Sequence, residues 1–134
     1  MKYHTIKSDI WEDEKLSKLD FVGRLFFIGL ISQANDYGKL RGNIQLLKSK
    51  IFPYDDGEVK IEDYIKELVS FGMIESYNVN DEQYLKINNW SKYQKVEHPS
   101  KDIIPEPSRE FHEGFAKSSE AFAPNQVNQV NILK

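Results

Sequence analysis

The succession of apolar periodicities between residues 19 and 90 constrains the fold of this chain more than any other feature. An apolar segment at helical spacing runs into Tyr37-Gly38, a second stops at Pro53 and a third stops at Gly72. Two short stretches of alternating apolar and polar residues follow, up to Trp90. Apolar residues at every third or fourth position indicate helices, and alternation indicates strands. The order predicts three helices and a β-hairpin, an α+β winged helix-turn-helix domain with a flexible C-terminal tail.

The first predicted helix begins after Asp20, whose carboxylate suits the N-cap position. Gly23 and Gly29 each lower helix propensity by about 1 kcal/mol relative to alanine, so we expect another element to approach closely there. Trp11, in the charged lead before this helix, is expected to anchor that lead on the core. The apolar stripe of the helix is so wide that we expect most of it to be buried; it comprises Phe21, Leu25, Phe26, Phe27, Ile28, Leu30 and Ile31.

The remaining elements are shorter. Residues 39–41 suit a short edge strand, residues 43–51 a second helix and residues 60–71 a third. Gly72 suits the position after a helix where the backbone turns left-handed. The hairpin is expected to turn through a loop of about three residues, Asn80-Asp81-Glu82.

Three prolines interrupt the chain after the hairpin, at positions 99, 105 and 107. Proline restricts both its own backbone and that of the preceding residue, which is typical of a linker. We therefore expect a winged-helix domain over residues 1–98 and a poorly packed linker and polar tail over residues 99–134. Ser108 could cap a short helix in this tail that carries Phe111 and Phe115.

Charge is unevenly distributed although the net charge is only −3. Residues 37–50 carry four basic side chains and no acidic one, and residues 85–101 carry four lysines against one glutamate. The stretch between them, residues 51–84, carries two lysines against nine acidic residues. Such patchiness can place a positive face on an acidic protein, but an ordinary solvated surface accounts for it as well.

In a helix-turn-helix domain the third helix normally enters the major groove of DNA. Here its polar face carries Glu62, Asp63 and Glu67 among Lys60, Lys66 and Ser70, a mixture poorly suited to phosphates. The two basic segments offer better chemistry, because lysine and arginine bind phosphates and amides can pair with adenine. The candidate DNA-binding residues are Lys39, Arg41, Asn43, Gln45, Lys48, Lys50, Lys86, Lys92 and Lys95.

Several segments resemble a known family when they are taken in order. They are Ile10-Trp11-Glu12-Asp13-Glu14-Lys15-Leu16, Arg24–Leu30, Ala34–Leu40, Ile51–Asp56, Phe71–Ile74 with Tyr77, Tyr84–Trp90 and Ser91–Lys95. The set is similar to the N-terminal winged-helix domain of phage replication proteins, the replisome-organiser and DnaD-like initiator group. The resemblance covers residues 8 to 105.

The resemblance implies a phage or prophage protein that handles DNA at a replication origin, in the cytoplasm of a bacterial host. Full-length members of the group usually carry a C-terminal domain that contacts the helicase-loading machinery. No room remains for such a domain after residue 105, so we expect a small relative or a fragment.

Two other functions remain open. The acidic stretch from Asp55 to Glu67 could dock on a host replication protein or in a homodimer, and a transcriptional regulator would share the same fold. Trp90 and Tyr93 could stack on unpaired bases, although anchoring in the core is the expected role of Trp90.

The residue inventory gives no indication of an enzyme, a metal site or a membrane span. The chain has no cysteine, and its three histidines are too widely spaced to resemble a metal site. No glycine-rich phosphate loop, catalytic motif or apolar run of membrane-spanning length is present. We therefore expect no cofactor and no membrane partner.

Overall fold

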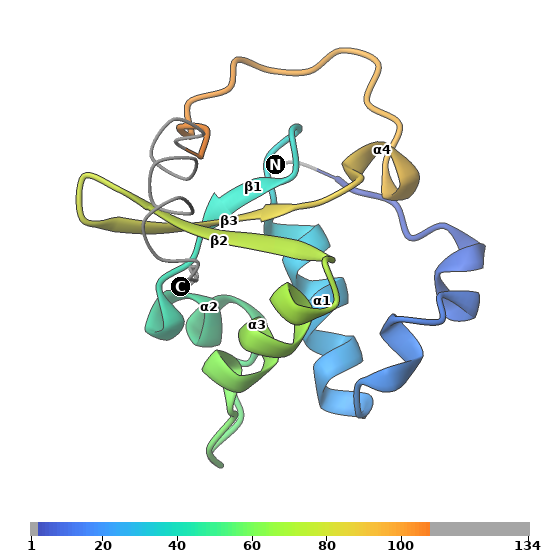
Figure 1. Cartoon of the computed structure of the whole chain (residues 1–134), viewed down its shortest axis with the longest axis vertical. Coiled ribbons are helices and arrows are strands. Elements are labelled where there is room, and N and C mark those ends of the chain that lie inside the picture. Colours follow the sequence, from blue (N-terminus) through green and yellow to red (C-terminus); the bar gives the residue numbers. More distant parts are fainter. Residues whose placement is uncertain (1–2, 108–134) are drawn as a thin grey trace, which may run out of the picture.

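The computed structural model describes residues 3–107 as an α+β arrangement of helices and a small antiparallel sheet (Figure 1). Two 3₁₀ helices lead into the first long helix, and a single helical turn follows the last strand. In chain order the elements are η1 (Ser8–Glu12), η2 (Leu16–Lys18), α1 (Phe21–Gln33), β1 (Lys39–Arg41), α2 (Ile44–Ile51), α3 (Ile61–Ser70), β2 (Ile74–Val79), β3 (Glu82–Ile87) and α4 (Trp90–Tyr93). Within these residues no helix is long and apolar enough to cross a membrane.

The three strands form one antiparallel sheet in the order β1-β3-β2. Strand β3 is therefore central, and it pairs with the short strand that precedes α2 as well as with its hairpin partner. The helices α1, α2 and α3 cover one face of this sheet (Figure 1). This order of elements, with the helices on one face, is compatible with a winged helix.

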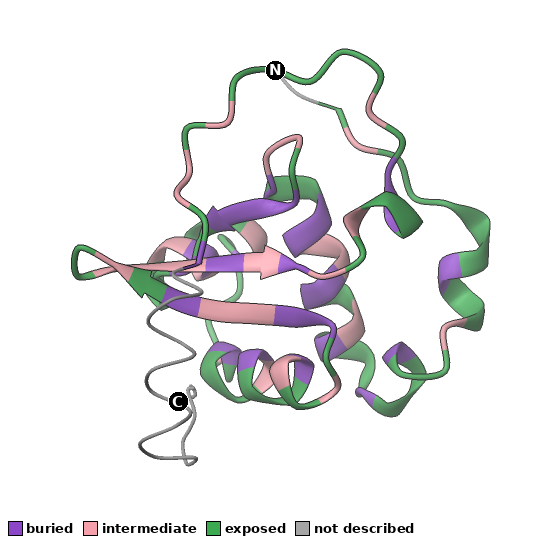
Figure 2. Ribbon diagram, turned by 45° about the horizontal axis from the view of Figure 1, so that its top comes forward, coloured by how far each residue is buried: buried purple, intermediate pink, exposed green. Residues whose placement is uncertain are grey.

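The core lies between α1 and the elements that surround it (Figure 2). The buried face of α1 carries Phe26, Phe27, Leu30 and Ile31. The expectation that most of the stripe is buried is confirmed, but its first two members are not covered: Phe21 is 81% exposed and Leu25 is 54% exposed. Helix α1 is apolar on more than one side, whereas its packing partners meet the side of Phe26 and Leu30.

The predicted helix ends at Asp20 and Gly72 are confirmed, and Asn43, expected inside the second helix, is instead its N-cap. The Asp20 carboxylate accepts a hydrogen bond from the Gly23 amide at 2.8 Å, and the Asn43 side chain accepts one from the Leu46 amide at 3.0 Å. After α3, Gly72 has φ +74°, and the amide of Met73 donates to the carbonyl of Leu68. Side-chain acceptors and a left-handed residue therefore satisfy the free backbone groups at these ends.

The hairpin turn is tighter than the predicted three residues. Glu82 already pairs with Val79, so Asn80 and Asp81 alone form the turn. Both have positive φ, 52° and 65°, as a type I′ turn requires. Asparagine and aspartate tolerate this left-handed conformation better than most residues, so a glycine is not needed here.

The lead before α1 is anchored by a different residue from the one expected. Trp11 is 67% exposed, whereas its neighbour Ile10 is 4% exposed and belongs to the core cluster. The 3₁₀ turn of η1 directs Ile10 inward and leaves the larger indole outside. The prediction that Trp11 anchors the lead is therefore wrong.

The chain after residue 99 does not leave the domain at once, which corrects the expectation of a poorly packed segment there. Residues 100–107, which we call the strap, return across the face of the sheet opposite the helices (Figure 1). Tyr77 on β2 donates a hydrogen bond to the carbonyl of Pro105 at 2.7 Å, and Pro107 is buried. The proposed helix at Ser108, with Phe111 and Phe115, lies outside the described residues.

The close approaches expected at Gly23 and Gly29 are both present, and the tighter one is at Gly29, where α1 meets the end of α2. A Cβ added at Gly29 would lie 2.6 Å from Cγ2 of Ile51, and one added at Gly23 would lie 3.0 Å from the Tyr64 ring. A contact of 2.6 Å requires Ile51 to move, because its branched methyl group is near the backbone.

Gly29→Ala is accordingly expected to lower the free energy of unfolding by about 1–2 kcal/mol, even though alanine is the better helix former. Urea denaturation followed by circular dichroism measures the effect. Gln33→Ala, an exposed change on the same helix, is the control. In a double-mutant cycle Ile51→Ala should cost less stability in the Gly29→Ala background than in the wild type. A Gly29→Ala variant more stable than the wild type would contradict the close approach.

Candidate nucleic-acid interface

The exposed basic surface of the molecule is built on the path from β1 into α2. Arg41 ends β1 with 64% of its side chain exposed, and its Nε lies 3.8 Å from a Glu82 carboxylate oxygen. Gln45 and Lys50 follow on α2, and both are exposed. A charge-bearing strand end and a capped helix thus hold three polar side chains within ten residues of chain. These side chains can contact phosphates and a base edge.

Two other predicted contacts on α2 have structural roles. Asn43 is the N-cap of the helix, and its side-chain oxygen accepts a hydrogen bond from the Leu46 amide. Lys48 donates to the carbonyl of Phe52 at 3.3 Å and to that of Asp55 at 3.0 Å, so it binds carbonyls just beyond the helix C-terminus. A cation at this position interacts favourably with the helix dipole. Substituting Lys48 would therefore disturb α2 as well as remove a charge.

Lys39 and Lys86 lie directly opposite each other across the β1–β3 pair. Both belong to the outer face of the sheet, on the side away from the helices, but neither presents a free charge. Lys39 is 1% exposed and lies 2.5 Å from carboxylate oxygens of Asp102 and of Glu106. Lys86 is 26% exposed and lies 2.9 Å from the other oxygen of Glu106. In this conformation the strap withholds both predicted contacts from a nucleic acid.

The charges of this cluster stabilise one another. Hydrogen bonds from Lys39 and then Lys86 hold the pKa of Glu106 below its ordinary value. Burial lowers the pKa of Lys39, but Asp102 and Glu106 outweigh burial and the net direction is upward. Lys39 therefore stays charged and the Glu106 carboxylate stays ionised around neutral pH. Asp102 and Glu106 were missed as functional residues because their sequence context, between prolines, is typical of a linker.

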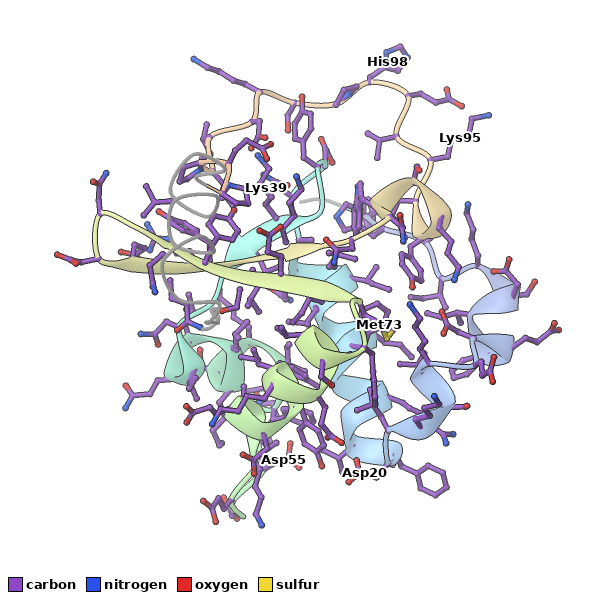
Figure 3. The ribbon with its side chains drawn as sticks, in the orientation of Figure 1. Asp20, Lys39, Asp55, Met73, Lys95 and His98 are labelled. Carbon is purple, nitrogen blue, oxygen red and sulfur yellow. The ribbon has the colours of Figure 1, made fainter. Side chains whose placement is uncertain are left out.

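The last two predicted contacts lie beyond the end of β3 that is remote from the hairpin turn. Lys92, on α4, is 57% exposed and donates to Asp13 at 3.1 Å. Lys95 is exposed on the segment that follows α4 (Figure 3). The β1–β3 pairing thus brings Lys39 and Lys86 together, whereas Lys92 and Lys95 are carried to the far end of the strand. The nine candidates do not form one continuous surface.

The two aromatic residues of α4 are anchored to the protein. The Trp90 indole donates from Nε1 to the carbonyl of Asp36 at 2.8 Å and packs against the core, as expected. Tyr93 is 8% exposed, and burial followed by the negative charge of Asp13 raises its pKa to about 12. Stacking of unpaired bases on these two rings is therefore not supported by their burial.

The third helix has the acidic exterior that its sequence suggests. All six residues of its predicted polar face are exposed: Lys60, Glu62, Asp63, Lys66, Glu67 and Ser70. Lys66 lies 3.8 Å from Glu62, so one of the two lysines on this face is paired with a carboxylate of the same helix. This face would repel the phosphate backbone rather than attract it.

Within residues 3–107 no group of three or more histidine, aspartate or glutamate side chains is placed to hold a metal ion. His4 lies 2.7 Å from the carbonyl of Ala34 and meets Trp90 edge-on, and His98 is exposed. His112 is outside the described residues.

Comparisons with known proteins identify no family for this chain. No family model matches this chain, and neither a curated protein nor a solved structure shows significant similarity to it. The geometry described above is therefore the basis for assigning a function.

The Asp13 carboxylate, which engages Lys92, ties the lead to α4 and makes a testable contribution to stability. One oxygen accepts from the amides of Lys15 and Leu16, and the other accepts from Lys92 and from Tyr93. Burial raises the pKa of Asp13, but the Leu16 amide and Lys92 outweigh burial and hold it below 3.8.

A carboxylate whose pKa is lowered by folding stabilises the protein fully above its unfolded-state pKa, and this contribution is lost as the pH falls through the folded-state pKa. We therefore expect Asp13→Asn to be less stable than the wild type at pH 6, with the difference shrinking below about pH 3.8. Urea denaturation at a series of pH values measures this difference, and Glu14→Gln controls for the loss of one exposed charge. A difference that is independent of pH would contradict the assigned role.

Proposed function

We propose that this chain is a winged-helix DNA-binding protein of the kind that acts in phage replication initiation. The order of helices and strands and the sheet order β1-β3-β2 support the fold. Three of the segments that carry the family resemblance coincide with parts of the helices and strands of this fold. Arg24–Leu30 is the middle of α1, Phe71–Ile74 is the turn between α3 and β2, and Tyr84–Trp90 is the central strand with the start of α4.

The observation that carries the proposal is the exposure of Arg41, Gln45 and Lys50 around a capped α2. Arg41 and Lys50 would contact phosphates on the DNA backbone, which supply most of the affinity and position the protein. Gln45, in the first turn of α2, is the residue whose amide can pair with an adenine edge. Residues 37 to 50 contain no acidic residue, so the carboxylate beside Arg41 comes from Glu82 on the neighbouring strand.

In this proposal DNA approaches α2 and the strand end at Arg41, rather than the polar face of α3. The three carboxylates on α3 would repel phosphates, so the groove-reading role usual for a third helix is disfavoured. Docking by way of α2 places the acidic helix toward the edge of the interface.

We expect the protein to bind duplex DNA in fluorescence anisotropy with a dissociation constant below tens of micromolar in about 50 mM salt, weakening steeply as salt is added. The double variant Arg41→Glu with Lys50→Glu should weaken binding by about tenfold or more. It should also reduce the slope of log K against log salt concentration by roughly 2, since two phosphate contacts are lost. This pair leaves the helix caps Asn43 and Lys48 in place.

The matched control is Lys7→Glu with Lys15→Glu, which makes the same change in net charge on exposed residues of the N-terminal lead. Equal weakening by the two variants would mean that overall charge, and not the α2 surface, determines binding. Absence of binding by the wild type at tens of micromolar would overturn the proposed function.

The acidic face of α3 favours a second candidate, a protein-binding module that uses this helix to contact a basic partner or a second copy. Light scattering on the DNA-free protein tests the homodimer. If α3 forms it, Glu62→Lys with Glu67→Lys should convert a dimer into a monomer. A wild-type protein that is monomeric at hundreds of micromolar would exclude the homodimer.

A further inference from the structure

The outer face of the sheet contains a charge arrangement that requires an anion. Lys39 and Lys86 are direct cross-strand partners, and like charges at such positions destabilise a sheet. Each ammonium group is partly or fully withdrawn from water, which increases the repulsion between them. Strand pairing therefore creates a site for a negatively charged group between two lysines.

The strap supplies that group. Glu106 places one carboxylate oxygen 2.5 Å from Lys39 and the other 2.9 Å from Lys86, so a single anion bridges both lysines. Asp102 adds a second carboxylate 2.5 Å from Lys39, and the carbonyl of Ile104 accepts from the same ammonium group at 3.2 Å. A DNA phosphate likewise has two non-bridging oxygens, and each can accept a hydrogen bond from one of two ammonium groups.

Contacts at both ends hold the strap in place without burying its charges deeply. The Ser100 amide donates to Asp36 at 2.8 Å, and Tyr77 donates to the Pro105 carbonyl. Glu106 nevertheless remains 61% exposed and Asp102 23% exposed. A competing polyanion can therefore reach the exposed Glu106 carboxylate and take its place. Because Lys39 is nearly buried, it can give up the strap only in exchange for another anion.

We propose that the strap is an acidic latch that occupies a phosphate-binding site on the outer face of the sheet, and that DNA displaces it to bind Lys39 and Lys86. The inference rests on the proposed DNA-binding function and adds to it a second contact region and its regulation. The strap and a phosphate use the same two ammonium groups, so their binding is mutually exclusive.

The latch site lies next to Arg41, the strand residue of the proposed DNA contact. Arg41 is two residues from Lys39 on β1, so both side chains lie on the outer face of the sheet. Next to them Tyr84 stacks on Tyr77, with 5.7 Å between ring centroids. Release of the strap would add Lys39 and Lys86 to the exposed Arg41 on this face of the sheet.

The test compares the wild type with Asp102→Asn/Glu106→Gln in anisotropy titrations with duplex DNA. The released variant should bind about three- to tenfold more tightly in 50 mM salt, with a salt slope larger by roughly 1–2. Glu12→Gln/Glu14→Gln removes two exposed acids elsewhere and controls for net charge. If circular dichroism shows that the double variant folds poorly, Glu106→Gln alone takes its place. This single variant keeps the Lys39–Asp102 pair, so its gain in DNA affinity should be smaller.

Movement of the strap is measured separately. The chain has no cysteine and Ile103 is 83% exposed, so Ile103→Cys accepts a single spin label. Saturating duplex DNA should increase the mobility of this label, read from its electron paramagnetic resonance spectrum. The mobility should reach the value seen when the same label is placed on the Asp102→Asn/Glu106→Gln variant.

Wild-type binding with an unchanged label, or an affinity gain no larger than that of the control, would overturn the latch and leave the proposed function standing. Absence of DNA binding by both the wild type and the released variant would overturn the two together.

Discussion

The pairing of β1 with β3 is the constraint on which the rest of the arrangement depends. It joins a three-residue strand before α2 to the central strand of the hairpin, 45 residues later in the chain at Leu40 and Leu85. The pairing buries Leu40 and Leu85 against the helices and turns Lys39, Arg41 and Lys86 to the outer face. One set of backbone hydrogen bonds therefore completes the core and also creates the charged surface, because side chains alternate along a strand.

The distribution of exposed charge depends on which carboxylates are engaged in contacts within the protein. Asp20 caps α1, Asp13 ties the lead to α4, and Glu106 neutralises two lysines at once. Acids on α3 remain exposed and give that helix a negatively charged face. A net charge of −3 thus coexists with an exposed basic edge around α2, since net charge does not say which charges are already paired.

The candidate site was only partly predictable. Arg41, Gln45 and Lys50 could be identified because a run of basic and amide residues without acids stays together on a short strand and helix. Lys39 and Lys86 have the same residue type but a different environment, and their acidic partners lie 63 and 20 residues away. Lys92 and Lys95 are adjacent to the hairpin in sequence, yet the length of β3 carries them to its other end.

The sequence by itself determined the elements and their ends, because caps, glycines and apolar spacing act over a few residues. Asp20 and Gly72 could each be assigned from their neighbours. Only the tertiary structure decided which sides of those elements are covered. Phe21 and Trp11 are as apolar as the residues that are buried, and Asp102 looks like part of a linker. Burial and ion pairing depend on partners remote in the chain, and local periodicity carries no information about those partners.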